Sequence, residues 1–375
     1  MKDIFILGGS KLQLDLIYEA KKLYLNVHLF DYDENCVGEK YADFFYHIDI
    51  KDKDEILKKA KEIKPIAILT IATEVGNITA CYVSEKLGLK SNSYKVAIET
   101  TNKISMKSIA KKGDIKTAIY DILKKDDDIN RWKYFPAIIK PADSSASRGV
   151  SFVKDKDEIK KAIQKAFLFS TKDEVLIEEY IQGKQFSVET ISSKGIHKLV
   201  AITEEYLTKL PDIIETQQLI PARIDEITSN KIEKFINNIL DSFSISYGAS
   251  HIEIKENSDG ELYLIELASR MGGWRSELIN YAYGVSYCRL LLYSVMDKSI
   301  EFEKSKDDTA IVKMILCEDD FVEYTRYLEK YPNYLIEDLN INNIKKSQHL
   351  ADSNGYYFIH IENKDDISNF IGKHI

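Results

Sequence analysis

The sequence is poor in cysteine and has no long apolar run. Its 375 residues include four cysteines, Cys36, Cys81, Cys288 and Cys317, which are scattered and form no C-x-x-C pair. This usage indicates reduced thiols, as in a cytoplasmic protein, rather than a disulfide framework. Because no apolar stretch reaches the length that crosses a bilayer, we expect no membrane span.

A basic surface and a secretion signal are also missing. The formal net charge is −8, the isoelectric point is near 5.6, and basic residues are mixed with acidic ones. This pattern does not predict a nucleic-acid partner. The first residues, MKDIFILGGSK, contain a short apolar segment without a small-residue cleavage site, which favours a first strand over a signal peptide. We therefore expect a cytoplasmic protein.

The first part of the chain alternates predicted strands and helices, which is typical of a parallel α/β sheet. The strands cover 3–7, 26–31 and 66–72, and the helices cover 11–24, 52–63 and 76–87. The turn after the first strand, GGS at 8–10, lacks the G-x-G-x-x-G spacing of a dinucleotide site. We interpret it as a tight turn whose amides are free for an anion, and keep nicotinamide binding as an alternative.

The pattern changes after residue 91 and again near residue 299. A helical stretch over 94–112 is followed by short alternating strands and one helix over 226–241, which predicts an α+β domain. The last part holds two strand-like runs and a helix near 319–331. The predicted domains are therefore 1–91, 92–298 and 299–375, the last being a small α+β domain or a cap.

The segment HIEIKENSDGELYLIEL, at 251–267, predicts a hairpin that carries two carboxylates. Asp259-Gly260 is typical of a two-residue type I′ turn. With that turn, Glu253 lies opposite Glu266, and their Cβ atoms are about 4.5–5.5 Å apart. The other face pairs Ile252 and Ile254 with Leu267 and Ile265.

Facing carboxylates are destabilising unless a shared proton, an arginine or a divalent cation compensates them. Oxygen ligands without cysteine or clustered histidine favour Mg²⁺ or Mn²⁺ over zinc. The alternative is that both glutamates lie on a solvated sheet face. The segment SRMGG that follows favours a site, because Arg270 suits a phosphate or carboxylate and Gly272-Gly273 leave amides open to an anion.

Two further segments have the character of a nucleotide site. In FPAIIKPADSSASRGVSFV, at 135–153, a strand ends near Lys140 and a loop of small hydroxylated residues follows, which could cover phosphates as a lid. A polar hairpin loop is the alternative. In EVLIEEYIQGKQFSVE, at 174–189, the backbone could bind an adenine edge while Tyr180 and Ile181 wall the ring. An ordinary hairpin with an acidic corner is the alternative there.

Together and in this order, these segments resemble the ATP-grasp superfamily, and most closely its carboxylate–amine ligases with a pre-ATP-grasp N-terminal domain. These are related to biotin carboxylase, carbamoyl phosphate synthase and the purine-biosynthesis carboxylate ligases. Further stretches that carry the resemblance are TEVGNITACYVSEKLGL, TNKISMKSIAKKGDIKTA and IIETQQLIPARI. The resemblance implies a Rossmann-like parallel-sheet domain, an ATP-grasp domain with a lid near 140–150, and a small C-terminal α+β domain.

The resemblance also implies the chemistry. An ATP-grasp ligase joins a carboxylate to an amine, or a similar nucleophile, through an acyl phosphate and releases ADP and phosphate. It uses ATP with Mg²⁺, or with Mn²⁺ as the alternative, and its partners are small carboxylates and amines, with a homodimer as one expected assembly. The alternatives are an enzyme acting on bicarbonate and a non-catalytic nucleotide-binding protein. The sequence shows no Ser-His-Asp pattern, no biotinylation motif and no glutaminase domain.

Individual residues match positions of the family. Those matching nucleotide-binding positions are Lys103, Lys140, Ser144, Ser145, Ser147, Gly149, Glu178, Tyr180, Ile181 and Gln185. Those matching metal positions are Glu253 and Glu266, and those matching catalytic positions are Arg270 and Lys140. Candidates for substrate binding are Glu74, Arg275 and Ser276. Two departures are Gln185, where the family usually has a glutamate, and Ala268, where it often has asparagine. His251 has either a direct role or a packing role.

Overall fold

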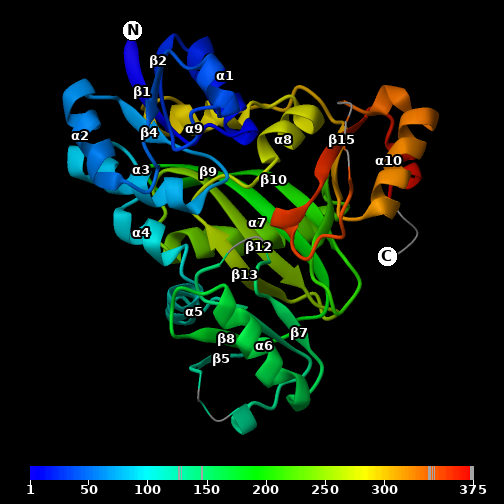
Figure 1. Ribbon diagram of the computed structural model, residues 1–375. Helices are drawn as coiled ribbons and strands as arrows, with labels where there is room; N and C mark the ends of the chain where they lie inside the picture. Colours follow the sequence, from blue (N-terminus) through cyan, green and yellow to red (C-terminus); the bar gives the residue numbers. More distant parts are fainter. Residues whose placement is uncertain are drawn as a thin grey trace.

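The computed structural model of the chain is shown in Figure 1. It describes residues 1–371 with the exception of Asp126, Asp128, Ser145, Ala146, Glu337, Asp338, Asn340 and Asn342. The described residues form three sheets, which are a parallel N-terminal sheet, a large central sheet and a smaller sheet below it in Figure 1.

The N-terminal sheet has the predicted parallel α/β arrangement. Its strand order is β3-β2-β1-β4, and every pairing is parallel. The strands are β1 (Lys2–Leu7), β2 (Leu25–Asp31), β3 (Phe44–His47) and β4 (Ala67–Leu69), and the helices are α1 (Leu14–Lys22), α2 (Lys53–Ile63) and α3 (Glu74–Leu87). The sequence analysis did not anticipate β3, an edge strand that is mostly exposed.

The turn after β1 differs from the expectation of free amides. The backbone N–H of Gly9 donates a hydrogen bond of 2.6 Å to Asp31 Oδ2 at the end of β2. A Cβ atom at Gly9 would lie 2.2 Å from Cys36 Sγ, so the turn is also closely packed. Because Asp31 already occupies this amide, the turn is a structural link between β1 and β2 rather than an open anion site.

The central sheet has seven strands, all paired antiparallel, in the order β13-β12-β9-β10-β11-β14-β15. The strands are β9 (Lys184–Ser193), β10 (Ile196–Leu207), β11 (Glu215–Ile220), β12 (Gly248–Glu256), β13 (Leu262–Ala268), β14 (Thr309–Ile315) and β15 (Gly355–Ile361). The last two strands belong to residues 299–375, so this region extends the central sheet instead of forming a sheet of its own.

Helices cover both faces of the central sheet. The helix α7 (Glu226–Ser242) packs through Ile232, Ile236 and Ile239 on one face. The helices α8 (Arg275–Tyr283) and α9 (Tyr287–Val295) share a second core with the opposite face and with the N-terminal domain. The helix α10 (Glu318–Lys330) packs on β14 and β15. The N-terminal and central domains are therefore joined by a continuous apolar core.

The smaller sheet forms a subdomain that we call the lid subdomain (120–179). Its strands are β5 (Tyr120–Leu123), β6 (Ala137–Pro141), β7 (Ser151–Val153) and β8 (Val175–Glu179), in the order β5-β8-β6-β7, and α6 (Lys156–Leu168) covers one face. The predicted helical stretch over 94–112 is two helices, α4 (Tyr94–Glu99) and α5 (Lys103–Lys112). Asn102 separates them, since its side chain accepts a hydrogen bond of 2.9 Å from the Ser105 amide and caps α5.

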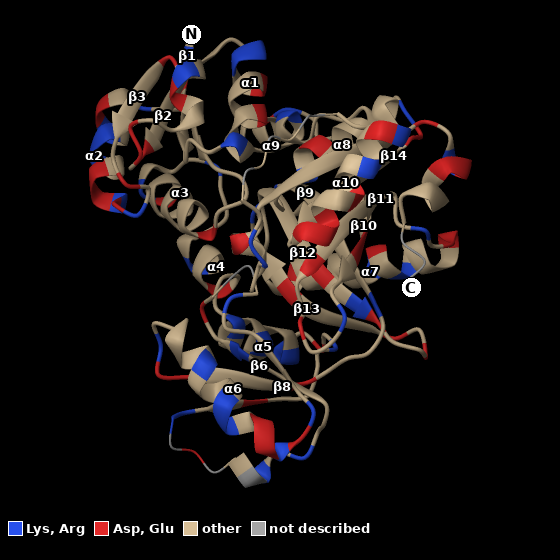
Figure 2. Ribbon diagram, turned by 45° about the vertical axis from the view of Figure 1, so that its right-hand side comes forward, with Lys and Arg blue, Asp and Glu red and all other residues tan. Residues whose placement is uncertain are grey.

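Charge is spread over the whole molecule. Figure 2 shows Lys and Arg interleaved with Asp and Glu on the helices and loops of each domain. In the part of the chain that the structure describes, no helix combines the length and apolar character that a bilayer-crossing segment needs.

Candidate functional site

The hairpin of β12 and β13 confirms the predicted carboxylate pair. Glu253 lies directly opposite Glu266. The predicted two-residue turn is wrong, because Glu256 pairs with Leu262 and the loop is longer. The side chain of Asn257 closes this loop by accepting hydrogen bonds from the backbone of residues 259 and 261. A bulge after Glu253 absorbs the one-residue shift and restores the register at the carboxylates.

The bulge changes the pairing beyond the carboxylates. Ile254 pairs with Leu264 instead of the expected Ile265. Ile265 therefore turns toward the same side as Glu253 and Glu266, and it lines a cavity of about 290 Å³. The hairpin thus contributes both charged and apolar surface to one pocket.

Most of the predicted site residues line this cavity. They are Glu74, Lys103, Lys140, Ser144, Ser147, Glu178, Tyr180, Ile181, Gln185, Glu253, Glu266, Arg270 and Arg275. Gly149 and Ser276 are not among its lining residues, and Ser145 lies outside the described residues. Ser276 donates a hydrogen bond of 2.7 Å to Asp15 and contacts Cys288, so it belongs to the seam between α8 and the N-terminal domain.

Two lysines hold Glu178 between them at the lid side of the cavity. Glu178 Oε2 lies 2.6 Å from Lys107 Nζ, and its Oε1 pairs with Lys140. Burial alone would raise the pKa of Glu178, but the two ammonium groups outweigh it and bring the pKa down to about 2. Burial lowers the pKa of Lys107, whereas Glu178 raises that of Lys140 against its burial. The Glu178 side chain thus binds lysines.

Lys103 connects the lid loop to the carboxylate hairpin. Its Nζ lies 3.1 Å from Glu266 Oε2 and donates a hydrogen bond of 2.8 Å to the carbonyl of Ser144. Its backbone N–H donates to the carbonyl of Ala142. The start of α5 therefore positions one ammonium group between the loop after β6 and the tip of β13.

The lid loop is packed against the end of α6. Gly149 has φ +77°, and a Cβ atom there would lie 2.8 Å from Pro141 Cγ and 3.0 Å from Phe169 Cβ, so this position requires glycine. At the other end of the loop, Asp143 accepts hydrogen bonds from the Ser170 hydroxyl and from the backbone N–H of Thr171.

A further buried cation that the sequence analysis missed, Lys255 of β12, contacts the segment after β8. Lys255 Nζ donates a hydrogen bond of 3.1 Å to the carbonyl of Ile181 and lies 4.5 Å from the centre of the Tyr180 ring. Burial lowers the pKa of Lys255 to about 8. The segment at 179–181 is thereby anchored to β12.

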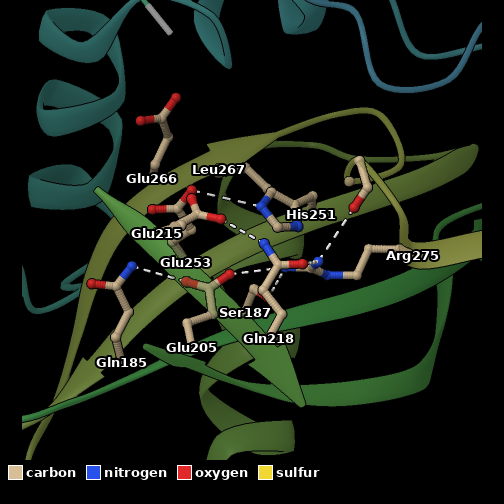
Figure 3. Close-up of polar contacts among 12 residues, drawn as sticks. Gln185, Ser187, Glu205, Glu215, Gln218, His251, Glu253, Glu266, Leu267 and Arg275 are labelled. Atoms are coloured by element: carbon tan, nitrogen blue, oxygen red, sulfur yellow. Dashed lines mark hydrogen bonds and ion pairs between the residues drawn. The ribbon is translucent and has the colours of Figure 1, made fainter. Parts of the chain in front are cut away.

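A buried arginine organises the other end of the cavity (Figure 3). Arg275 begins α8 and is 1% exposed. Its Nη2 donates to Ser187 Oγ at 2.7 Å and to Glu205 Oε1 at 2.8 Å, and its Nη1 donates to Gln218. Its Nε lies 3.5 Å from Glu189. One guanidinium group thus ties α8 to three strands, β9, β10 and β11.

His251 extends this network to the carboxylate pair. Its Nδ1 lies 2.5 Å from Glu189 Oε1, and its Nε2 lies 3.6 Å from Glu253 Oε1. Burial would lower the pKa of His251, but the two carboxylates raise it to about 9. The Gly272 amide donates to Glu189 at 3.2 Å, and a Cβ atom at this glycine would lie 2.7 Å from His251 Nδ1. The absence of a side chain at Gly272 therefore lets its backbone lie close to His251 and Glu189.

Carboxylates outnumber cations at this end. Glu205, Glu215 and Glu253 lie near one another, and desolvation followed by repulsion from Glu205 and Glu253 raises the pKa of Glu215 to about 8. Gln218 Nε2 donates to Glu215 Oε2 at 2.5 Å, and Gln185 Nε2 donates to Glu205 at 2.8 Å. Carboxylates therefore outnumber Arg275 and His251 at this end of the cavity.

The alternation of the strands could have revealed this network. Residues 185, 187 and 189 of β9 pair with 255, 253 and 251 of β12, so polar side chains at every second position share one face. Two further members, Glu205 and Gln218, come from the neighbouring strands β10 and β11. Gln218 lies in the stretch IIETQQLIPARI, but the sequence analysis assigned no role to either residue.

Arg270 connects the site to the N-terminal domain. Its guanidinium group pairs with Glu74 at the start of α3, and its Nη1 donates a hydrogen bond of 3.1 Å to the carbonyl of Met271. Burial raises the pKa of Glu74, but Arg270 outweighs it and lowers the pKa overall. Arg270 Nε is buried and has no hydrogen-bond partner among the described residues, and the Arg270 side chain lines the cavity.

The donor set of the hairpin fits a hard divalent cation. The described residues contain no cluster of three or more histidine, cysteine, aspartate or glutamate side chains suited to a metal ion. Glu253 and Glu266 face each other, and they offer two carboxylates. This fits Mg²⁺, which keeps waters and takes phosphate oxygens as its remaining ligands.

Comparisons with known proteins concern the family and the fold. The family model described as ATP-grasp domain matches residues 133–277. A formate-dependent phosphoribosylglycinamide formyltransferase of Prochlorococcus marinus (strain MIT 9312) is 28% identical over 280 residues, covering 72% of this chain and 70% of that protein. A D-alanine–D-alanine ligase of Flavobacterium johnsoniae is 29% identical over 211 residues, covering 52% of this chain and 63% of its own length. The chain thus spans slightly less than two thirds of the second relative.

Solved structures share the fold over almost the whole chain. An L-amino acid ligase from Bacillus licheniformis has a TM-score of 0.81 at 20% identity, covering 99% of this chain and 96% of that one. An N5-carboxyaminoimidazole synthetase from Staphylococcus aureus, solved with ADP, has a TM-score of 0.79 at 17% identity, covering 98% and 95%. At these identities the likeness concerns the fold.

Proposed function

Since the chain belongs to the ATP-grasp superfamily and is an ATP-dependent ligase that forms carbon–nitrogen bonds, we propose that it joins a carboxylate to an amine through an acyl phosphate. The observation that supports this most is the shared cavity. It brings Lys103, Lys140 and the lid loop to the same pocket as the facing glutamates and Arg270. Phosphoryl transfer depends on such positioning and charge stabilisation more than on a nucleophilic side chain.

In this proposal the residues of the lid side bind the nucleotide. Lys140 and Lys103 contact its phosphates, and the lid loop covers them and excludes water. Tyr180 and Ile181 wall the adenine, while Lys255 fixes the segment that carries them. Gln185 hydrogen-bonds Glu205, so we infer that this pair, rather than Gln185 alone, faces the ribose.

The facing glutamates would hold Mg²⁺. A bound Mg²⁺ would supply charge neutralisation at the nucleotide phosphates. The substrate carboxylate attacks the γ-phosphate of ATP, forming a P–O bond to the carboxylate oxygen and releasing ADP. Arg270, which lines the same cavity, steadies the acyl phosphate with its guanidinium group. The amine then displaces phosphate and forms the amide, and its proton leaves to solvent.

Hydroxylamine tests this reaction without knowledge of the natural amine. The protein is incubated with ATP, Mg²⁺, hydroxylamine and a panel of amino acids and other small carboxylates. The expected products are a hydroxamate from one class of acid and ADP with phosphate. In parallel, Mg-ATP and Mg-ADP should raise the melting temperature, because a ligand bound only to the native state stabilises it.

The products separate this function from its alternatives. AMP and pyrophosphate would contradict the acyl-phosphate route. ADP without hydroxamate, formed on addition of bicarbonate, would favour a carboxylating enzyme. Equal thermal shifts with ATP, GTP and NAD would argue against the adenine-binding role of residues 178–181.

A further inference from the structure

A loop of the C-terminal region, Ser347–Asn354, is fixed at both ends to the end of β14. The Ser347 N–H donates a hydrogen bond of 2.8 Å to the carbonyl of Leu316, and the Asn354 N–H donates one of 2.9 Å to the carbonyl of Ile315. The side chain of Asn354 also bridges the carbonyls of Ile315 and Lys345. Because its ends meet on neighbouring residues, this loop, which we call the clipped loop, is held as a compact projection.

The tip of the clipped loop reaches the cavity. Leu350 lines the same pocket as the facing glutamates and the lid lysines. The short 3₁₀ helix Leu350–Asp352 gives the tip a defined shape, and the Ser347 hydroxyl donates to the carbonyl of Asp352 across the loop. A residue far along the chain, in the region whose role the sequence analysis left open, is thus a wall of the candidate active site.

The tip also touches the lid subdomain. The rings of His349 and Phe169 lie edge to face, with centroids 6.2 Å apart and an interplanar angle of 84°. This is a favourable aromatic geometry. His349 Nε2 lies 3.2 Å from Asp352, while its Nδ1 is buried and has no hydrogen-bond partner among the described residues. At the Nδ1 side, the His349 ring is therefore positioned, within the described part of the chain, by packing and not by a hydrogen bond.

Phe169 in turn packs beneath the lid loop. It follows the last residue of α6, and its side chain lies where a Cβ atom on Gly149 would collide with it. The contacts therefore run without a gap from the lid loop through Phe169 to His349 and then to Leu350 in the cavity wall. The base of the clipped loop is meanwhile held by its hydrogen bonds to the end of β14.

We propose that the clipped loop is the surface on which the lid subdomain closes, through Phe169 on His349. One movement then shuts the cavity at the phosphate lid and at the wall formed by Leu350. This proposal rests on the proposed nucleotide-binding function. It gives the C-terminal region a role, which is to complete the closed cavity and shield a bound acyl phosphate from water.

Hydrogen exchange measured by mass spectrometry tests this coupling in the full-length protein. The probe is Mg²⁺ with the non-hydrolysable analogue AMP-PNP, and the reporters are peptides covering 142–150 and 347–354. In the wild type the analogue should protect both peptides. In Phe169→Ala it should still protect the first peptide but lose most of the protection of the second, and His349→Ala should behave in the same way.

A neighbouring residue supplies the control. Leu168 is 81% exposed at the end of α6, so Leu168→Ala should keep the wild-type protection of both peptides. Equal protection of 347–354 in Phe169→Ala, His349→Ala and the wild type would overturn the coupling while leaving nucleotide binding intact. Protection of 142–150 alone in the wild type would do the same. Protection of neither peptide would overturn the nucleotide function, and the coupling with it.

Discussion

The two ends of the cavity bury charge in different ways. At the lid end, each cation has a nearby carboxylate, as Lys140 and Lys107 have Glu178 and Lys103 has Glu266. At the other end, Arg275 and His251 are surrounded by more carboxylates than they can neutralise. The lid end thus has three cations for two carboxylates, whereas carboxylates outnumber cations at the other end.

The two ends also differ in how firmly their cationic side chains are held. Lys103 and Lys107 lie in α5 and Lys140 lies in β6 beside the lid loop, so the three ammonium groups come from two elements. Arg275 is held by five groups and cannot reorient without breaking them. We infer that the lid end responds to the nucleotide and that the Arg275 network forms the rigid floor against which substrates are placed.

The largest effect is expected where the two ends meet, at the facing glutamates. Glu266→Gln keeps the size of the side chain but removes a charge from the proposed Mg²⁺ site. Turnover should fall by on the order of 10³-fold, because charge stabilisation of a transferred phosphoryl group depends on that site. Steady-state ADP release measures it, and circular dichroism checks the fold. Wild-type turnover would contradict the metal role.

Removing Arg275 from its network should instead lower the stability of the fold. Arg275→Met leaves Glu205 and Glu189 buried without their guanidinium partner, so the free energy of unfolding should fall by about 3–5 kcal/mol in urea titrations. Adding Glu205→Gln should recover part of the loss. Arg131→Met, which removes an ion pair between half-exposed side chains, should cost about 0–1 kcal/mol. Equal losses in the buried and exposed variants would contradict the network's role.

The lid end and the hairpin were largely predictable from sequence, because their residues occur in short segments with fixed spacing. Glu253 opposite Glu266 followed from strand alternation together with an assumed two-residue turn, and a bulge after Glu253 restores that pairing although the turn is longer. The turn was mispredicted because Asn257 closes a longer loop and a bulge compensates for it, and alternation carries no information about either.

The Arg275 network could not be predicted in the same way. Its contacts join residues 57 to 88 positions apart, such as Arg275 with Gln218 and with Ser187. They depend on which strands become neighbours in the central sheet. The placement of Ser276 away from the cavity has the same origin, because α8 turns that side chain toward Asp15. Sequence proximity to a motif does not determine which face of a helix reaches the site.

The smallest predicted effect concerns the lid end and depends on pH. Glu178→Gln leaves Lys107 and Lys140 buried without a shared anion, and should lower the free energy of unfolding by roughly 3 kcal/mol at neutral pH. The pKa of Glu178 is about 2 in the folded protein, below the ordinary value of 4.5 that we assign to the unfolded chain. Its contribution is therefore complete above pH 4.5 and is lost as the pH falls toward 2. Urea titrations at pH 7, 5 and 3.5 should show the free energies of unfolding of the wild type and the variant converging only below pH 4.5.

Glu55→Gln, at an exposed pair with Lys58, should differ little from the wild type throughout. A difference that stays constant from pH 7 to 3.5 would mean that Glu178 acts through packing, and the lid end would then resemble the rigid floor.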